Sequence, residues 1–215
     1  MIKLDRIDMI TKVSLLSSFL ANPRRGNLEA VFQIFAYLDN KNNARMVFDP
    51  TYPEIGMSDF KTCDWKEFYG SATEALPPDA PIPIGKEVDL HLYVDSDHAG
   101  DKVTRRSCTG SFIFLNIAPI IWFSKRQQTV DTSVFGSEFV AMKNGMEALR
   151  RLRYELWMMG VPLSVPSFAY GDNMSVVHNT QRPESVLKKK SNSIWYHACH
   201  EAVAIDEMLI GRVRS

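Results

Sequence analysis

The chain has 215 residues, of which 45% are hydrophobic and 23% charged, values typical of one globular domain with an appendage. Its formal net charge is zero, so no overall field indicates a polyanionic partner. No apolar stretch is long enough to span a membrane, so we expect no membrane partner. The cysteines form neither a metal-type pair nor an even disulfide set, which favours a reducing, intracellular compartment; they are Cys63, Cys108 and Cys199.

The first part of the chain, residues 1–50, is predicted to be a small helical segment. Apolar residues recur at helical spacing from Ile7 to Leu16, and a second apolar stripe runs from about Leu28 to Leu38. A break at residues 22–26 separates the two helices. The run Met46-Val47-Phe48 is a candidate for a short strand.

Residues 51–85 have a different composition, with Pro53 and a proline cluster between Pro77 and Pro83. Aromatic residues lie between these prolines. This composition predicts either an ordered loop that wraps a surface or a linker. We place the main boundary near residues 84–86, so that the second domain covers 86–215.

The second domain shows a βββαβα order of elements, typical of an α/β fold. Residues 88–94 alternate between apolar and polar side chains, which predicts a strand with one buried face. A long apolar stripe from Phe135 to Met159, capped by Ser133 or Thr132, predicts the main helix. The remaining predicted elements are strands at 110–115, 120–124, 168–170 and 209–213 and helices at 176–180 and 192–207.

Three carboxylates stand at the ends or starts of separate predicted elements. Asp95 ends the first strand, Glu138 lies one turn into the long helix, and Asp172 ends the fourth strand. If the first and fourth strands are neighbours, the three meet at one edge of the sheet, where carboxylate oxygens suit a hard divalent cation. Each residue alone also has a structural explanation, since aspartates after strands form turns and a glutamate in a first helical turn complements the helix dipole.

Five runs of residues appear in a particular order and spacing. They are Tyr-Val-Asp-Ser-Asp-His-Ala-Gly-Asp at 93–101, Arg-Arg-Ser-Cys-Thr-Gly at 105–110, Ile-Trp-Phe-Ser-Lys-Arg-Gln at 121–127, Thr-Ser-Val-Phe-Gly-Ser-Glu-Phe-Val-Ala at 132–141 and Tyr-Gly-Asp-Asn-Met-Ser-Val at 170–176. Together they resemble the ribonuclease H domain of copia-type LTR retrotransposon Pol polyproteins. Residues 6–50 are similar to the end of the reverse-transcriptase region and its connection.

The resemblance implies a ribonuclease H-like mixed five-stranded sheet flanked by helices. It implies that Asp95, Glu138 and Asp172 are the catalytic and metal-binding residues, holding two Mg²⁺ ions, with Mn²⁺ as a substitute. The implied activity is hydrolysis of the RNA strand of RNA–DNA hybrids, which such enzymes recognise through the 2′-hydroxyl. The implied partners are the hybrid and the remainder of the Pol polyprotein, in cytoplasmic retrotransposon particles and in the nucleus.

Two departures from the family keep an alternative open. The family carries a last aspartate in an Ala-Asp segment beyond its final helix, and this sequence ends at Ser215 before such a segment, as a C-terminally truncated fragment would. No Tyr-x-Asp-Asp motif is present, so we do not expect polymerase activity. The alternative is a non-catalytic remnant or a nucleic-acid-binding or structural module. An integrase-like nuclease fits less well, because integrases place their glutamate last and here Glu138 precedes Asp172.

Basic residues near the carboxylates form a second group of candidates. Phosphate contacts position a nucleic acid without reading its sequence, and a run of charge is as often a solvated face. The candidates are Lys125, Arg126, Lys188, Lys189 and Lys190. His197 and His200 lie one helical turn apart, but no further ligand completes a metal set, which favours a structural role.

Overall fold

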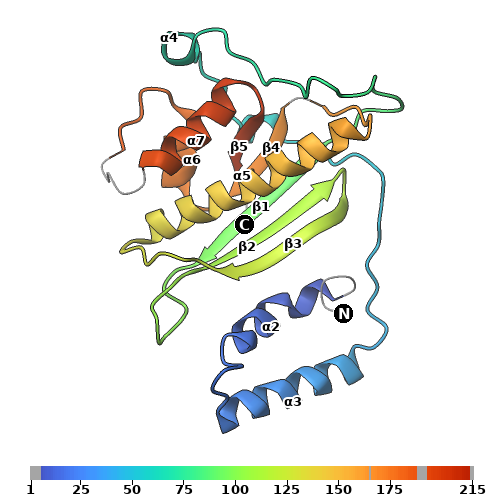
Figure 1. The fold of residues 1–215 in the computed structure, drawn as a ribbon, viewed down its shortest axis with the longest axis vertical. Helices are drawn as coiled ribbons and strands as arrows, with labels where there is room; N and C mark the ends of the chain where they lie inside the picture. Colours follow the sequence, from blue (N-terminus) through green and yellow to red (C-terminus); the bar gives the residue numbers. More distant parts are fainter. Residues whose placement is uncertain (1–5, 165, 188–192, 214–215) are drawn as a thin grey trace.

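A computed structural model describes residues 6–164, 166–187 and 193–213, and it shows a sheet covered by helices on one face with a separate helical hairpin beside it (Figure 1). The mixed five-stranded α/β sheet predicted from the sequence is confirmed. Its strands are β1 (Leu90–Asp97), β2 (Cys108–Leu115), β3 (Ala118–Arg126), β4 (Ser167–Gly171) and β5 (Met208–Arg212). Within the described residues, no helix is both long and apolar enough to cross a membrane.

The order of strands in the sheet is β3-β2-β1-β4-β5. The first three strands form antiparallel hairpins, whereas β4 runs parallel to β1 and β5 runs parallel to β4. The carboxyl ends of β1 and β4 therefore lie at the same edge. This places the residues after both strands close together, as the carboxylate hypothesis requires.

The long helix α5 (Val134–Met158) packs against β1 and carries Glu138. Ser133 caps its first turn, because the Ser133 hydroxyl accepts a hydrogen bond from the Gly136 amide at 3.1 Å. Further along, a Cβ atom at Gly145 would lie 2.5 Å from a methyl of Val94. Only glycine allows this approach without a shift of one element, so Gly145 sets how closely α5 lies on β1.

Two shorter helices complete the covering layer, α6 (Met174–Gln181) and α7 (Ser193–Ala204). Asn173 caps α6, since its side-chain oxygen accepts from the amides of Ser175 and Val176. Helix α7 ends before the predicted residue 207, at a turn in which Asp206 has a φ of 56°. A positive φ at a non-glycine residue is incompatible with continuing the helix.

Residues 51–85 run along the sheet and its helices as a strap that contains η2 (Met57–Asp59) and α4 (Lys66–Tyr69). Phe60 packs where Gly211 has no side chain and contacts Phe168. Glu74 pairs with Arg153, a residue of α5 whose side chain is fully buried. The strap therefore contributes to the packing of the sheet and of α5.

Two local expectations are wrong. Residues 46–48 form no strand and stay irregular, because no neighbouring strand lies beside them to share hydrogen bonds. The outward-facing His91 of β1 is 2% exposed, although the alternating pattern predicts one buried face. Its ring stacks on Phe168 of β4 at 5.2 Å, so aromatic packing covers part of the second face as well.

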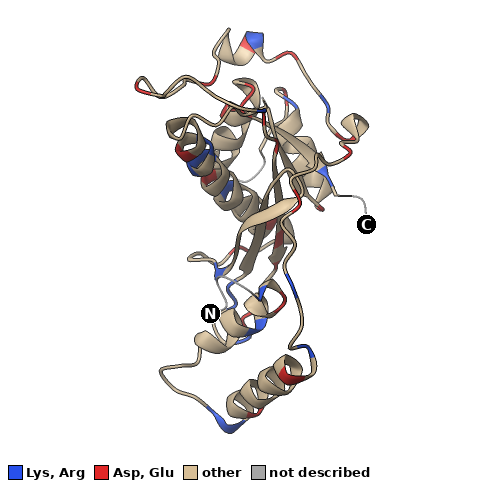
Figure 2. Cartoon of the chain, turned by 90° about the vertical axis from the view of Figure 1, so that its right-hand side faces the viewer, with Lys and Arg blue, Asp and Glu red and all other residues tan. Residues whose placement is uncertain are grey.

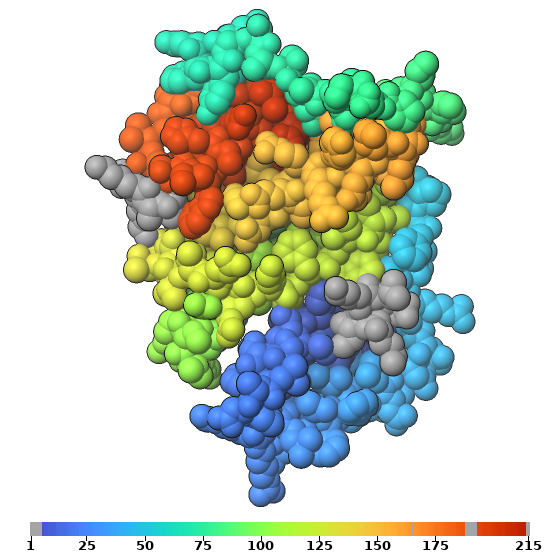
Figure 3. Space-filling model, viewed as in Figure 1, coloured from blue at the N-terminus to red at the C-terminus, as the bar shows by residue number. Residues whose placement is uncertain are grey.

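The first helices, α2 (Ile10–Ser17) and α3 (Arg25–Asn40), form a helical hairpin beyond the edge strand β3 (Figures 1 and 3). Neither helix contains a buried residue. The view at right angles shows charges of both signs along the outer face of α5, while the hairpin helices are largely uncharged (Figure 2). The hairpin contacts the sheet through α2, where the Ser14 hydroxyl donates to the Ser124 carbonyl at 2.8 Å.

Candidate metal centre

Asp95, Glu138 and Asp172 converge at one point of the structure. Each offers one carboxylate oxygen, and these oxygens all lie within 4.8 Å of one another. Asp95 comes from β1, Glu138 from the second turn of α5, and Asp172 directly follows β4. The parallel pairing of β1 with β4 and the close approach of α5 at Gly145 explain why residues so distant in sequence meet.

The three carboxylates differ in exposure. Asp95 and Asp172 are exposed, whereas Glu138 is 7% exposed. Asp95 accepts a hydrogen bond from the Ser96 amide at 2.8 Å, which fixes its orientation. The site therefore presents two accessible carboxylates over a buried third.

Burial, together with the nearby charges of Asp172 and Asp95, raises the pKa of the Glu138 carboxyl to about 8. A hydrogen bond from the Ser96 amide acts in the opposite direction. Without a cation, Glu138 thus favours its protonated form at neutral pH, first because burial disfavours the charged carboxylate and second because Asp172 and Asp95 repel a further negative charge. A cation bound among the carboxylates would reverse this preference.

The donor set fits a hard divalent cation. Three carboxylate oxygens from rigid elements can share one ion, and Mg²⁺ completes its octahedral shell with waters. The neighbouring charges that help to raise the Glu138 pKa are the same charges that a cation would balance. The residues that would hold the ion are Asp95, Glu138 and Asp172.

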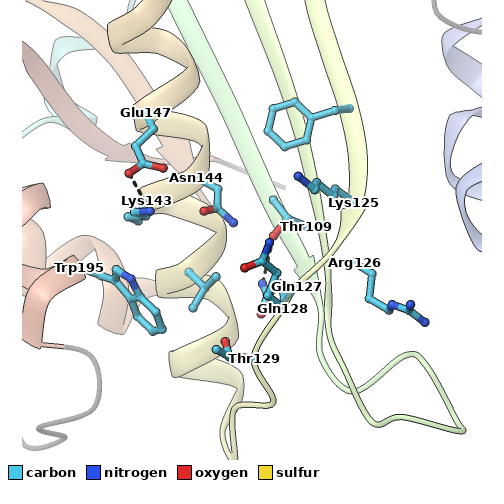
Figure 4. A pocket seen from close by; sticks show the side chains of 12 residues that line it. Thr109, Lys125, Arg126, Gln127, Gln128, Thr129, Lys143, Asn144, Glu147 and Trp195 are labelled. Atoms are coloured by element: carbon cyan, nitrogen blue, oxygen red, sulfur yellow. Dashed lines mark hydrogen bonds and ion pairs between the residues drawn. The ribbon is translucent and has the colours of Figure 1, made fainter.

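A groove of about 560 Å³ runs between α5 and the end of β3 (Figure 4). Lys125 lies at this groove, whereas Arg126 points away from α5 and pairs with Asp101 at 2.8 Å. Lys143 and Trp195 also line the groove, and Lys143 pairs with Glu147 at 2.7 Å. A lysine within an amphipathic helix gives no signal of its own, so the sequence pattern did not indicate Lys143. The other basic candidates, Lys188, Lys189 and Lys190, lie outside the described residues.

Gln127 occupies the floor of this groove and is 3% exposed. Its amide nitrogen donates to the Thr109 hydroxyl at 3.0 Å and to the Ser137 carbonyl at 2.9 Å. The Gln127 side-chain oxygen has no hydrogen-bond partner among the described residues. The groove therefore contains an unused acceptor as well as two lysines.

The histidine pair of α7 belongs to no group of metal-ligating side chains among the described residues. His200 is buried, donates a hydrogen bond from Nε2 to the Asn179 carbonyl and packs on Tyr196, whereas His197 is exposed. Burial lowers the pKa of His200. The structural role favoured by the sequence agrees with these contacts.

Comparison with known proteins shows which proteins the chain is similar to. A stretch of 113 residues is 31% identical to the retrovirus-related Pol polyprotein from transposon RE1 of Arabidopsis thaliana, and it covers 53% of the chain and 8% of that protein. An uncharacterized mitochondrial protein of Arabidopsis thaliana is 39% identical over 61 residues, which are 28% of the chain and 25% of that protein. The chain is a relative of retrotransposon Pol polyproteins.

This Pol polyprotein relative spans only 8% of the transposon protein and 25% of the mitochondrial one. No protein-family model matches it. Among solved structures, LC11-RNase H1 isolated from compost aligns with a TM-score of 0.44 and 13% identity, covering 58% of this chain and 84% of that one. The fold assignment therefore rests on the observed strand order of the sheet and not on this alignment.

Proposed function

We propose that the chain hydrolyses the RNA strand of RNA–DNA hybrids with the help of divalent metal, as the ribonuclease H part of a copia-type Pol polyprotein. The observation that carries this proposal is the convergence of Asp95, Glu138 and Asp172 oxygens within 4.8 Å. The relationship to Pol polyproteins supports a nucleic acid as substrate and other polyprotein segments as partners.

The exposed pair Asp95 and Asp172 would receive the cations. The buried Glu138 would lose its proton and become the third carboxylate ligand. Bound Mg²⁺ supplies positive charge that activates a water and stabilises the leaving oxygen in phosphodiester hydrolysis. The water oxygen bonds to phosphorus, the bond from phosphorus to the leaving ribose oxygen breaks, and that oxygen takes up a proton. The rigid elements β1, β4 and α5 hold the three carboxylates in place for this step.

The groove beside α5 would hold the hybrid next to the carboxylates. Lys125 offers charge to phosphates, Lys143 would do so by leaving its pair with Glu147, and Trp195 lines the same groove. Such contacts position the duplex, while recognition of the 2′-hydroxyl separates RNA from DNA. The near-zero net charge of the chain means that this positive charge is local.

The test is cleavage of an end-labelled RNA–DNA hybrid with Mg²⁺, compared with a DNA duplex of the same sequence. We expect hybrid cleavage only, lost on chelation. Asp95→Asn should reduce the rate by more than the ~10–100-fold that loss of an outer-shell metal partner costs. Asp79→Asn, an exposed carboxylate on the strap, is the matched control and should cleave normally.

The alternative function is a nucleic-acid-binding module without catalysis. It predicts that the folded protein binds the hybrid and that Mg²⁺ produces no cleavage at any pH between 7 and 9. Cleavage that survives Asp95→Asn would instead indicate a contaminating nuclease.

A further inference from the structure

A pocket of about 170 Å³ lies between α2 and the ends of β1, β2 and β3. The candidate metal ligand Asp95 lines it from the sheet, and Thr11 and Ser18 line it from the hairpin. It opens on the sheet face opposite α5, because Leu92 and Val94 point to α5 and alternate residues of a strand face opposite sides. The hairpin and the candidate metal centre therefore share one cavity.

The sheet leaves this cavity open for a specific reason. Asp95 pairs with Gly110 of β2, and Gly110 pairs with Ser124 of β3, so the three form one row across the strands. Gly110 has no side chain to fill the space between the other two. Helix α2 closes the far side, held by the hydrogen bond from Ser14 to the Ser124 carbonyl.

The hairpin side of the pocket is lined by hydroxyls. Thr11, Ser14 and Ser18 follow one another at steps of three and four, which places them on one face of the helical segment. The Ser14 hydroxyl is engaged with the sheet, whereas Thr11 and Ser18 are exposed. The Ser18 hydroxyl makes only a long hydrogen bond of 3.4 Å to the Ser14 carbonyl, which a ligand can replace. Hydroxyls in this position can donate to phosphate oxygens.

The sheet side supplies a guanidinium. Arg106 lines the pocket and is half-buried, and among the described residues its side chain has no ion pair or hydrogen bond. Arg126, the other arginine at the pocket, already pairs with Asp101. Arg106 is thus the cation that remains for a ligand, and a planar guanidinium suits a phosphate.

We propose that this pocket binds a backbone phosphate of the nucleic-acid strand that lies on Asp95, so that α2 of the hairpin is part of the substrate-binding surface. Thr11 and Ser18 donate hydroxyl hydrogen bonds, and Arg106 supplies the charge. The pocket is too small for a base pair and fits one phosphate with its sugar. The inference rests on the proposed function for its ligand class, a hybrid, but it concerns binding and not cleavage.

The acidic residues at the pocket are Asp95, Asp97 and Asp101, and they oppose a phosphate until their charge is balanced. Asp97 is exposed, so solvent and salt screen its charge. The Thr104 hydroxyl and amide and then Arg126 hydrogen-bond the Asp101 carboxylate and lower its pKa, so Asp101 is already compensated. Asp95 would be balanced by a divalent cation. Binding is therefore measured with Ca²⁺, which occupies carboxylate sites, and with the salt concentration as a second variable.

The experiment measures the Kd of a fluorescent RNA–DNA hybrid for the full chain by anisotropy. The double variant Thr11→Val with Ser18→Ala should raise Kd about 3- to 10-fold, which is the loss of one or two hydrogen bonds. Arg106→Met should raise it further and reduce the slope of log Kd against log salt by about one. Ser17→Ala, on the same helix but outside this pocket, is the control and should match the wild type.

An unchanged Kd and salt slope in both variants would overturn the proposal, provided that melting temperatures equal that of the control. Wild-type protein that fails to bind the hybrid would overturn it as well. The two proposals separate cleanly: tight binding that depends on Thr11, Ser18 and Arg106, without Mg²⁺-dependent cleavage, supports the phosphate site and rejects the nuclease. Mg²⁺-dependent cleavage by a protein whose hybrid binding does not depend on these three residues would support the nuclease and reject the phosphate site.

Discussion

The sheet region (residues 86–213) and the helical hairpin (residues 6–43) differ in what holds them together. Helix α5 has buried residues along its whole length, whereas α2 and α3 have none. Large apolar side chains of the hairpin, such as Phe32 and Phe35, are more than half exposed. The comparison shows that the sheet region carries the stability of the chain, while the hairpin contributes surface, including the wall of the pocket at Asp95.

The largest effect is expected at the ion pair that fastens the strap to α5. Arg153 is fully buried, so Glu74→Gln leaves its charge uncompensated and should cost about 3–5 kcal/mol of unfolding free energy. Glu155→Gln is the control, because its partner Arg151 is largely exposed and such surface pairs contribute about 0–1 kcal/mol. Urea denaturation of both variants measures the difference. Equal losses would mean that the strap is not part of the stable unit.

The contrast between core and hairpin is tested next with one substitution in each. Leu149 of α5 is fully buried and Leu28 of α3 is 54% exposed. Leu149→Ala should cost about 2–5 kcal/mol, and Leu28→Ala about 0.5 kcal/mol or less. The measurement is again the midpoint and slope of urea unfolding. A large loss at Leu28 would show that the hairpin face is covered in solution and would remove the contrast.

The sheet region was also the part more easily predicted from sequence, because its burial leaves periodic patterns of apolar residues. The apolar stripe of α5 and the alternation in β1 are local signals of burial, and the carboxylates could be placed because they follow those elements. The pairing of Glu74 with Arg153 joins residues 79 positions apart, and no local sequence pattern predicts it. The burial of His91 likewise depends on Phe168, which reaches it only once β4 pairs with β1.

The convergence of the three carboxylates at the candidate metal centre was predictable as a set of residues but not as a cavity. Order and spacing indicated Asp95, Glu138 and Asp172, whereas their unequal exposure depends on how closely α5 approaches β1 at Gly145. The contribution of α2 could not be read from the sequence, since Thr11 and Ser18 are ordinary helix-surface residues until the hairpin docks. Tertiary contact, and not propensity, decides both features.

A third test uses pH on the metal-free protein. Burial and the neighbouring carboxylates raise the pKa of Glu138 from its ordinary value of 4.5 to about 8, so between these values the folded state keeps a proton that the unfolded chain has lost. Stability therefore falls as pH rises from about 5 to 8. At about 1.4 kcal/mol per pKa unit, even half of this shift amounts to about 2 kcal/mol.

Glu138→Gln should remove this fall, which identifies its cause. His91 and His200 have lowered pKa values and act with the opposite sign, so the informative quantity is the difference between variant and wild type in EDTA at pH 5 and pH 8. Mg²⁺ should restore wild-type stability at pH 8 and leave the variant nearly unchanged. A fall of equal size in both proteins would show that Glu138 is not the group responsible.

The smallest effect concerns the start of α5. Ser133→Ala removes the acceptor of the Gly136 amide and should cost about 1 kcal/mol, since other helix contacts remain. Ser133→Asp keeps an acceptor at the cap and serves as the control. Because Glu138 lies one turn beyond the cap, loosening this turn should also weaken Mg²⁺ binding, which calorimetry measures. The loss of Mg²⁺ affinity should exceed that of a Leu152 variant destabilised by the same amount, since Leu152 is a core residue of α5 far from the carboxylates. Equal Mg²⁺ affinity in the Ser133→Ala protein would mean that β1 and the packing at Gly145, and not the helix cap, hold Glu138 in the site.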